Sequence, residues 1–278
     1  MGDPELGGRK IFEPIFIKTY TSLKKDLFLK QLLFIDIETV RAEATWETLS
    51  LGMQQQWIRK ALSLNQHEDL PIPELYRERA GIYAEFGKVI CISLGFFYQV
   101  EGVWHFKVKA YAHHDEQLLL QEFQTLLIEK FNQGNITFVA HNGKEFDYPY
   151  LCRRMLVHQI ELPPCLQLSG KKPWGHPHLD TLELWKFGDH KHYTPLALLA
   201  EIFNIPSPKD DIDGSQVGRV YYEEKNLQRI ARYCNQDVVT TARVFLRLKQ
   251  LADLEEEHIH SEYELKHLER HTVQQINT

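Results

Sequence analysis

The chain has few of the features that mark secreted or membrane-spanning proteins. Its 278 residues contain no C-x-x-C pair, and the only cysteines are Cys91, Cys152, Cys165 and Cys234. Scattered cysteines in a long chain that shows no signal peptide are typical of reduced thiols, so we expect a cytoplasmic protein. No apolar run reaches the roughly 18 residues that a membrane span needs, so we expect no membrane partner.

An excess of positive charge is also missing. The formal net charge is -6, from 32 lysines and arginines against 38 acids. Any polyanion must therefore be held by a local basic patch or by bound cations. The hydrophobic content of 43% and the charged content of 25% are those of an ordinary globular protein that can bury one sizeable core.

The hydrophobic pattern predicts one mixed α/β domain. Short apolar or alternating runs bounded by turn residues predict strands at 31–37, 88–98, 103–111 and 136–140. Apolar residues with helical spacing predict helices near 117–131, 147–158, 195–203 and 223–251. The expected organisation is an N-terminal extension (1–30), a domain (31–254) with a helical insertion (42–86), and a charged, helical C-terminal tail (255–278).

The first candidate site lies in the apolar run 33–39, which carries Asp36 and Glu38. Residues two apart in a strand point to the same face, so both acids should project side by side from a core element. A buried carboxylate without a partner costs several kcal/mol, and Mg²⁺ or Mn²⁺ would offset that cost. An edge strand that turns both acids to solvent is the alternative.

Two later stretches carry further acids. Asp147 opens a predicted helix after the strand 136–140, where it could equally be an ordinary N-cap. Tyr233 and Asp237 are four residues apart in a helix, so they share one face, which also carries apolar residues and should point inward. A buried tyrosine bonded to a helix carboxylate would give the same pattern.

The order of these motifs resembles the DEDD superfamily of 3′→5′ exonucleases. The branch with tyrosine in the third motif fits, because the histidine branch needs histidine where this chain has Arg232. The resemblance covers about residues 32–248. Within this superfamily, the chain resembles most the proofreading exonuclease domain of family B DNA polymerases and the stand-alone proteins that are similar to that domain. The sequence segments 85–90, 179–181 and 213–217 also match the pattern of this family.

The resemblance implies a ribonuclease H-like α/β fold, with a mixed, mainly five-stranded sheet flanked by helices. It also implies a metal-dependent 3′→5′ exonuclease that releases nucleoside 5′-monophosphates from single-stranded or frayed DNA. Two divalent cations, Mg²⁺ or Mn²⁺, would be held by four acids: Asp36 would bridge them, Glu38 and Asp237 would complete the site of the attacking water, and Asp147 would anchor the second ion. Tyr233 would orient the water.

Substrate contacts are expected at several further positions. The resemblance places Thr39 at the 3′ terminus and Asn142 and Phe146 at the next nucleotides, although Phe146 could simply be a packed aromatic residue. The loop 170–178 combines cations with an aromatic ring, and a second loop offers another cation. The candidates from these loops are Lys171, Lys172, Trp174 and Lys209. Solvated surface loops are the alternative interpretation.

Other kinds of protein also carry acidic motifs of this type or share this fold. A haloacid-dehalogenase-like phosphatase needs a second aspartate where this chain has Glu38. A non-catalytic nucleic-acid-binding module would be expected to lose some of the acids. An RNA-trimming enzyme of the same fold stays open, because the acids do not distinguish the two sugars. The insertion 42–86 could gate the cleft or bind a protein partner, and the sequence does not decide between them.

Fourteen histidines raise the possibility of a zinc site. Structural zinc normally takes four convergent ligands, usually with cysteine pairs, and no such pair is present. We therefore interpret the three close histidine pairs as solvated surface residues; they are His176/His178, His190/His192 and His258/His260.

Overall fold

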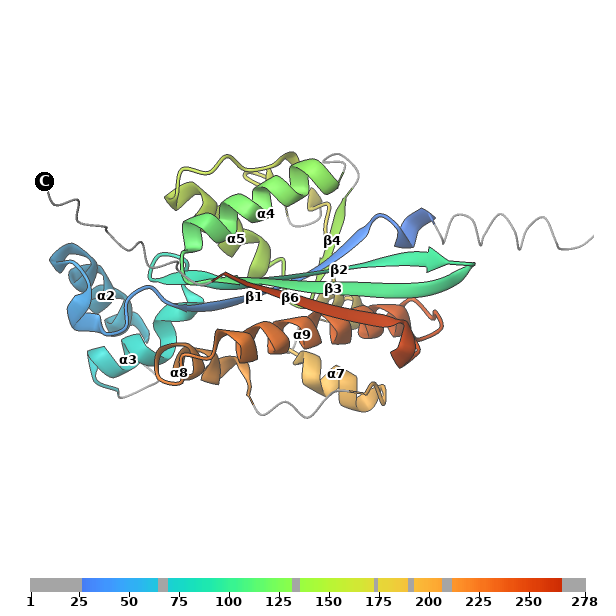
Figure 1. The fold of residues 1–278 in the computed structure, drawn as a ribbon. Helices are drawn as coiled ribbons and strands as arrows, with labels where there is room; N and C mark the ends of the chain where they lie inside the picture. The colour runs from blue at the N-terminus through green and yellow to red at the C-terminus, as the bar shows by residue number, and fades with distance from the viewer. Residues whose placement is uncertain are drawn as a thin grey trace, which may run out of the picture.

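Six strands form one mixed sheet in the spatial order β5-β4-β1-β2-β3-β6 (Figure 1). The computed structural model describes residues 27–64, 70–131, 136–172, 175–189, 193–206 and 212–266. The strands are β1 (Leu32–Arg41), β2 (Gly87–Val100), β3 (Val103–His113), β4 (Thr137–Ala140), β5 (Leu179–Asp180) and β6 (Ile259–Lys266). Strand β2 pairs antiparallel with both β1 and β3. The parallel pairs are β1 with β4, β4 with β5, and β3 with β6. The predicted mixed sheet of a ribonuclease H-like fold is confirmed.

The hairpin between β2 and β3 turns where the sequence predicts it. Glu101 and Gly102 both have positive φ, at 49° and 82°. Two successive residues with positive φ make a turn whose twist matches that of the flanking strands. Val100 and Val103 pair across it, which sets the register of the whole hairpin.

Helices cover both faces of the sheet (Figure 1). One face, here called the α4 face, is covered by α4 (Glu116–Lys130) and α5 (Asp147–Val157). The opposite α9 face is covered by α9 (Leu227–Leu248) and its neighbours; they are α6 (Thr181–Lys186), α7 (Leu196–Ile202) and α8 (Val217–Tyr222). Short 3₁₀ turns lie at η3 (Pro164–Leu166) and η5 (Gly214–Gln216). The central strand β1 is therefore buried on both sides, as its near-continuous apolar run predicts.

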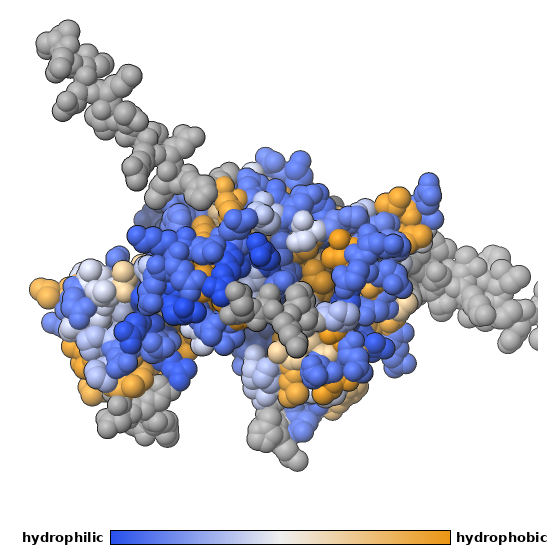
Figure 2. Space-filling view, turned by 60° about the horizontal axis from the view of Figure 1, so that its bottom comes forward, coloured by the Kyte–Doolittle hydropathy of each residue, from blue (hydrophilic) through white to orange (hydrophobic). Residues whose placement is uncertain are grey.

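The insertion has a small core of its own. It contains η1 (Trp46–Thr48), α2 (Leu51–Leu64), α3 (Ile72–Arg79) and η2 (Ala80–Ile82). Trp57 is fully buried there, with its ring centroid 5.3 Å from that of Tyr76 and 5.0 Å from that of Phe86. The insertion stands out as a lobe at the left end of the molecule in Figures 1 and 2, where Figure 2 shows hydrophobic patches on a mostly hydrophilic surface.

The prediction of a helical tail is wrong for residues 259–266, which form the sixth strand, β6, after the turn η6 (Glu256–His258). The physical reason is alternation: Glu262 and Glu264 point to one side of β6 and pair with Lys107 and Lys109 of β3, at 2.8 and 2.7 Å. Opposite charges on a neighbouring strand favour pairing of a charged segment with period two, and β3 supplies them. The part of the tail after Lys266 lies outside the described residues.

No helix in the described ranges is both long enough and apolar enough to span a bilayer. All four cysteines lie within those ranges and are free thiols.

Candidate active site

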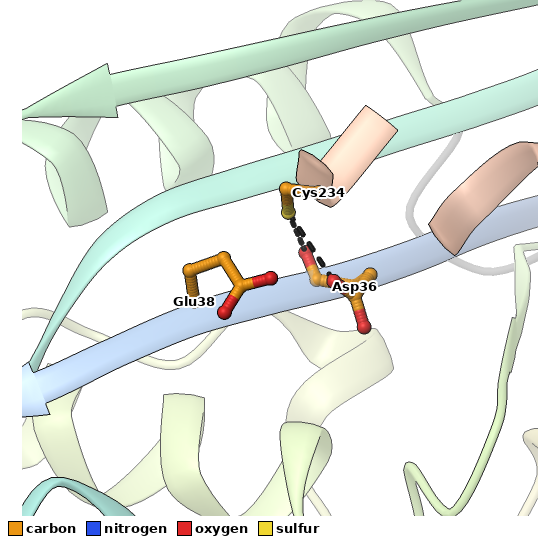
Figure 3. A group of neighbouring side chains, drawn as sticks. All are labelled: Asp36, Glu38 and Cys234. Atoms are coloured by element: carbon orange, nitrogen blue, oxygen red, sulfur yellow. Dashed lines mark hydrogen bonds between the residues drawn. The ribbon is translucent and has the colours of Figure 1, made fainter. Parts of the chain in front are cut away.

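Asp36 and Glu38 project from the middle of β1 onto the α9 face. Phe34 precedes them on that face and packs against Phe245 of α9, with ring centroids 5.5 Å apart. One ligand atom each from Asp36, Glu38 and Cys234 lie within 4.8 Å of one another (Figure 3). The structure thus brings the two acids of the first motif together on a buried face, and not on a solvent-exposed edge.

The strand ladder is interrupted directly after these acids. Glu38 pairs with Cys91 of β2, but the next residue, Thr39, pairs with Val89, so β2 carries one extra residue. Such a bulge bends a strand and redirects its side chains. The hydroxyl of Thr39 donates a hydrogen bond to the carbonyl of Gly81, at 2.9 Å, and thereby ties β1 to the insertion.

Asp147 approaches the acids of the first motif from the edge of β1 that pairs with β4. Strand β4 pairs with β1 only as far as Phe34, so backbone groups further along this edge need other partners. The amide of Ile37, between the two acids, donates to Oδ1 of Asp147 at 3.1 Å. Asp147 is the first residue of α5, while the N-cap position belongs to Phe146. Its carboxylate is 3% exposed and serves β1 instead of capping its own helix.

Helix α9 supplies the third motif. Tyr233 and Asp237 share one face, as their spacing predicts, and their side chains are hydrogen-bonded to each other. The thiol of Cys234 lies 3.3 Å from Oδ2 of Asp36 and 3.4 Å from its carbonyl oxygen, which fixes the helix against β1 (Figure 3). The sequence analysis did not select Cys234, although it lies next to Tyr233.

Three of the four acids, Asp36, Glu38 and Asp147, have raised pKa values, to which their acidic neighbours contribute. Burial is the largest cause of the raised pKa of Asp36, followed by the charges of Glu38, Asp147 and Asp237. Burial and then Asp237 raise the pKa of Glu38 well above its usual range. Burial raises the pKa of Asp147 to about 7, although two backbone amides act against it. Each carboxylate is therefore within electrostatic reach of the others, and their ionised forms need added positive charge.

A divalent cation fits this donor set. Asp36 and Glu38 present hard oxygen ligands within 4.8 Å of each other, which suit Mg²⁺ and Mn²⁺, whereas Asp147 and Asp237 lie outside that close group and act on Asp36 through their charges. The thiol of Cys234 does not compete for such an ion, because burial raises its pKa and keeps it protonated.

Tyr233 is a hydrogen-bond donor at this site. Burial, followed by the charges of Asp237, Glu38 and Asp36, raises the pKa of its hydroxyl far above the usual value. In the metal-free protein the hydroxyl is therefore protonated near neutral pH, and it can donate a hydrogen bond that orients a neighbouring group.

A buried aspartate holds the loop that presents Asp147. The carboxylate of Asp180 accepts hydrogen bonds from the amides of Asn142 at 2.9 Å, Lys144 at 3.1 Å and Leu182 at 2.9 Å. Gly143 is required in this loop, because a Cβ there would lie 2.4 Å from the Cβ of Ala140. The phrase at 179–181 in the sequence thus corresponds to a positioning role that its composition alone does not reveal.

Tyr193 is a second residue that the sequence analysis missed. Its side chain is 59% exposed, and its pKa is raised by burial and then by four nearby acids, of which Asp147 has the largest effect. His141 holds the adjacent backbone, with Nε2 2.9 Å from the carbonyl of Thr194 and Nδ1 2.9 Å from Oγ1 of Thr181. No spacing rule links residue 193 to the acids, because the connection is made by a loop.

The other predicted substrate contacts are more dispersed. Asn142 has a φ of 64° and lies in the loop that leads to Asp147. Phe146 is half-buried and packs against the core, with its ring centroid 5.3 Å from that of Tyr150, as in the alternative interpretation.

The basic loop candidates lie apart in the sequence from the acid-bearing segments. Lys171 and Lys172 are exposed in the segment that follows η3. Trp174 and Lys209 lie outside the described residues.

One predicted surface histidine is in fact part of the core. His178 is 1% exposed, with Nδ1 accepting from the amide of Phe138 at 3.3 Å and Nε2 2.8 Å from the carbonyl of Cys165. Burial lowers its pKa to about 4, so the ring is neutral. The expectation of a solvated residue is therefore wrong for His178, because its ring fills the space beside β4. His190 and His192 lie outside the described residues.

The chain matches one family model over residues 82–276, and that family is described as predicted 3′–5′ exonucleases related to the exonuclease domain of PolB. The matched region contains Asp147, Tyr233 and Asp237, whereas Asp36 and Glu38 precede it. No curated protein matches the chain by sequence. Because the match covers well over half of the chain, the chain belongs to this family of predicted 3′–5′ exonucleases related to the exonuclease domain of PolB.

Proposed function

We propose that the protein is a metal-dependent 3′→5′ exonuclease of the tyrosine branch, which removes nucleoside 5′-monophosphates from single-stranded or frayed DNA. One observation carries the proposal: β1, α5 and α9, which are far apart in the sequence, bring four carboxylates within electrostatic reach of one another, two of them buried and two half-buried. Membership of the exonuclease family supports the reaction class.

Two divalent cations, Mg²⁺ or Mn²⁺, when bound at such a site, acidify a water and stabilise charge on the phosphate and the leaving oxygen. Asp36, whose charge interacts with those of Glu38 and Asp147, would be the residue that holds both ions. Glu38 and Asp237 would hold the ion beside the attacking water, and Asp147 would hold the ion beside the leaving group. Tyr233 donates a hydrogen bond that orients the water.

The substrate strand approaches across the exposed side of Tyr193. Its ring offers a stacking surface for the terminal base, because aromatic side chains stack on any base without sequence preference. Thr39 and Asn142 would contact the terminal nucleotides, and Phe146, which packs against the core, would offer only its half-exposed side. Lys171, Lys172, Trp174 and Lys209 contact phosphates or bases further along the strand.

The test is the product ladder from a 5′-labelled single-stranded DNA, measured with Mg²⁺, with Mn²⁺ and with EDTA. We expect stepwise shortening from the 3′ end with either metal, none in EDTA, and none in Asp36→Asn. Glu129→Gln, which changes an exposed acid on α4, is the matched control and should be fully active. Equal cleavage in EDTA, or an active Asp36→Asn variant, would overturn the proposal.

A matching RNA oligonucleotide completes the test. We expect DNA to be shortened faster, in line with the relation to a DNA polymerase domain. Much faster shortening of RNA would assign the same acids to RNA trimming instead.

A further inference from the structure

Three side-chain pairs connect β3 and β6 on the α4 face of the sheet, each joining residue n of β3 to residue n + 155 of β6. Two are ion pairs, Lys107 with Glu262 and Lys109 with Glu264. The third has no opposite charges: it joins His105 to His260, with Nδ1 of the former 3.1 Å from Nε2 of the latter. Two imidazoles can share at most one hydrogen bond, and they repel each other when both are protonated.

A third imidazole adjoins this pair. His258, in η6, has its ring centroid 4.5 Å from that of His105, and its Nε2 lies 3.6 Å from Oε1 of Glu257. The ring of His260 is stacked on His105 with centroids 5.4 Å apart. Three histidines from two strands and a turn are therefore gathered at one end of the sheet edge, where His260 is exposed to solvent.

The spacing of the pair suits a transition metal. Two imidazole nitrogens in one tetrahedral zinc shell, each about 2.0–2.1 Å from the ion, lie about 3.3 Å apart. Nδ1 of His105 and Nε2 of His260 lie 3.1 Å apart, close to that separation. Imidazole is a preferred ligand of Zn²⁺, Ni²⁺ and Cu²⁺, whereas Mg²⁺ and Mn²⁺ prefer oxygen.

We propose that His105 and His260 chelate a Zn²⁺-class transition-metal ion at the outer edge of the sheet, with His258 as the third donor. His258 becomes a ligand when its side chain turns from Glu257 towards the pair. The ion clamps β6 and η6 onto β3. This site is separate from the acid cluster, because His105 and Lys107 face α4 whereas Asp36 and Glu38 face α9.

The experiment measures Zn²⁺ binding to the full chain in the presence of excess Mg²⁺, by competition with a chromophoric chelator and by the shift in Tm. We expect one Zn²⁺ per chain, with a Tm rise of several degrees. His260→Phe and His105→Phe should each weaken binding at least tenfold and abolish the Tm shift. His176→Phe, which changes a half-buried histidine elsewhere, should leave both unchanged.

The acid cluster is controlled for in the same experiment. Asp36→Asn should retain the Zn²⁺ site, and the Mg²⁺-dependent nuclease activity of His260→Phe should equal that of the wild type. The proposal fails if Zn²⁺ does not bind, or if binding survives in His260→Phe but is lost in Asp36→Asn. Should His105→Phe not fold, His260→Phe decides alone, since its side chain is exposed at the sheet edge. Loss of the nuclease activity would bear on the acid cluster and not on this site.

Discussion

Two buried groups of charges lie on opposite faces of the same sheet, and they are built differently. On the α4 face, Glu116 accepts hydrogen bonds from Nε and Nη2 of Arg154 at 2.9 and 2.6 Å and from the amide of Val89 at 2.7 Å, and Nε2 of His158 lies 2.7 Å from it. On the α9 side, the carboxylates around Asp36 meet one another without a matching cation among their strongest electrostatic neighbours.

The difference between the two clusters distinguishes a charge that is buried with its counter-charge from charges of one sign that are gathered at a candidate ion site. A carboxylate paired with a cation inside the protein stabilises the arrangement around it, whereas neighbouring ionised carboxylates repel one another, and an ion from outside would offset that cost. Glu116 therefore stabilises the fold, whereas the acid cluster costs stability that a bound cation would offset.

The largest expected effect is on the acid cluster. Asp237→Asn should lower kcat at least about 1,000-fold, equal to about 4 kcal/mol of transition-state stabilisation, because it removes a charge that holds the ions. The Tm of the metal-free protein should not fall, since one repelling charge has gone. Single-turnover cleavage of labelled DNA and a thermal melt measure the two quantities. A large loss of Tm with activity retained would reverse the assignment of the two clusters.

Glu116→Gln is the converse change. It leaves the guanidinium of Arg154 buried without its counter-charge, which should lower the free energy of unfolding by about 3 kcal/mol. Activity per folded molecule should be unchanged. Urea unfolding checks the stability, with Glu129→Gln on the same helix as the control. A loss below 1 kcal/mol would show that the paired cluster contributes little to the fold.

The stability of the acid cluster should also depend on pH. The carboxyl of Asp147 has a pKa of about 7 in the folded protein, against about 3.9 when unfolded. Between these values the folded state binds more protons, so the stability of the metal-free protein falls as pH rises from about 4 to about 7. Melts in EDTA at pH 5.5 and 8 should therefore show a lower Tm at pH 8. Asp147→Asn should flatten this slope and Mg²⁺ should reverse it; an unchanged slope in Asp147→Asn would assign it to other groups.

The smallest expected effect concerns the rim of the acid cluster. Tyr193→Ala should raise KM for single-stranded DNA about fivefold, or about 1 kcal/mol, by removing a stacking surface. Tyr193→Phe keeps the ring and is the matched control, with nearly normal KM. Steady-state kinetics on one oligonucleotide give both values. Equal effects of the two substitutions would show that the hydroxyl matters and stacking does not.

Local rules in the sequence predicted the parts of the site that depend on periodicity. The two-residue spacing of Asp36 and Glu38 and the four-residue spacing of Tyr233 and Asp237 each put two side chains on one face, whatever the rest of the chain does. The hairpin turn at Glu101 has a comparable local cause.

Contacts between distant segments could not be predicted in this way. The bond from Ile37 to Asp147 exists because β4 ends early, which no property of either residue indicates. Tyr193 reaches the acids through a loop held by His141. The sequence predicts a helix after Glu255 because the pairing with β3 cannot be recognised from the segment itself. In the structure, this pairing makes residues 259–266 a strand.

The thiol of Cys234 makes the acid cluster open to a kinetic probe. It is fully buried and lies against Oδ2 of Asp36, so any alkyl adduct on this sulfur would occupy the space beside that carboxylate. A reagent reaches it only when α9 separates from β1, and its modification rate consequently reports how often that happens. Ions and substrate bound between α9 and β1 should slow this modification. The modification rate of Cys234 would therefore measure how often the acid cluster opens.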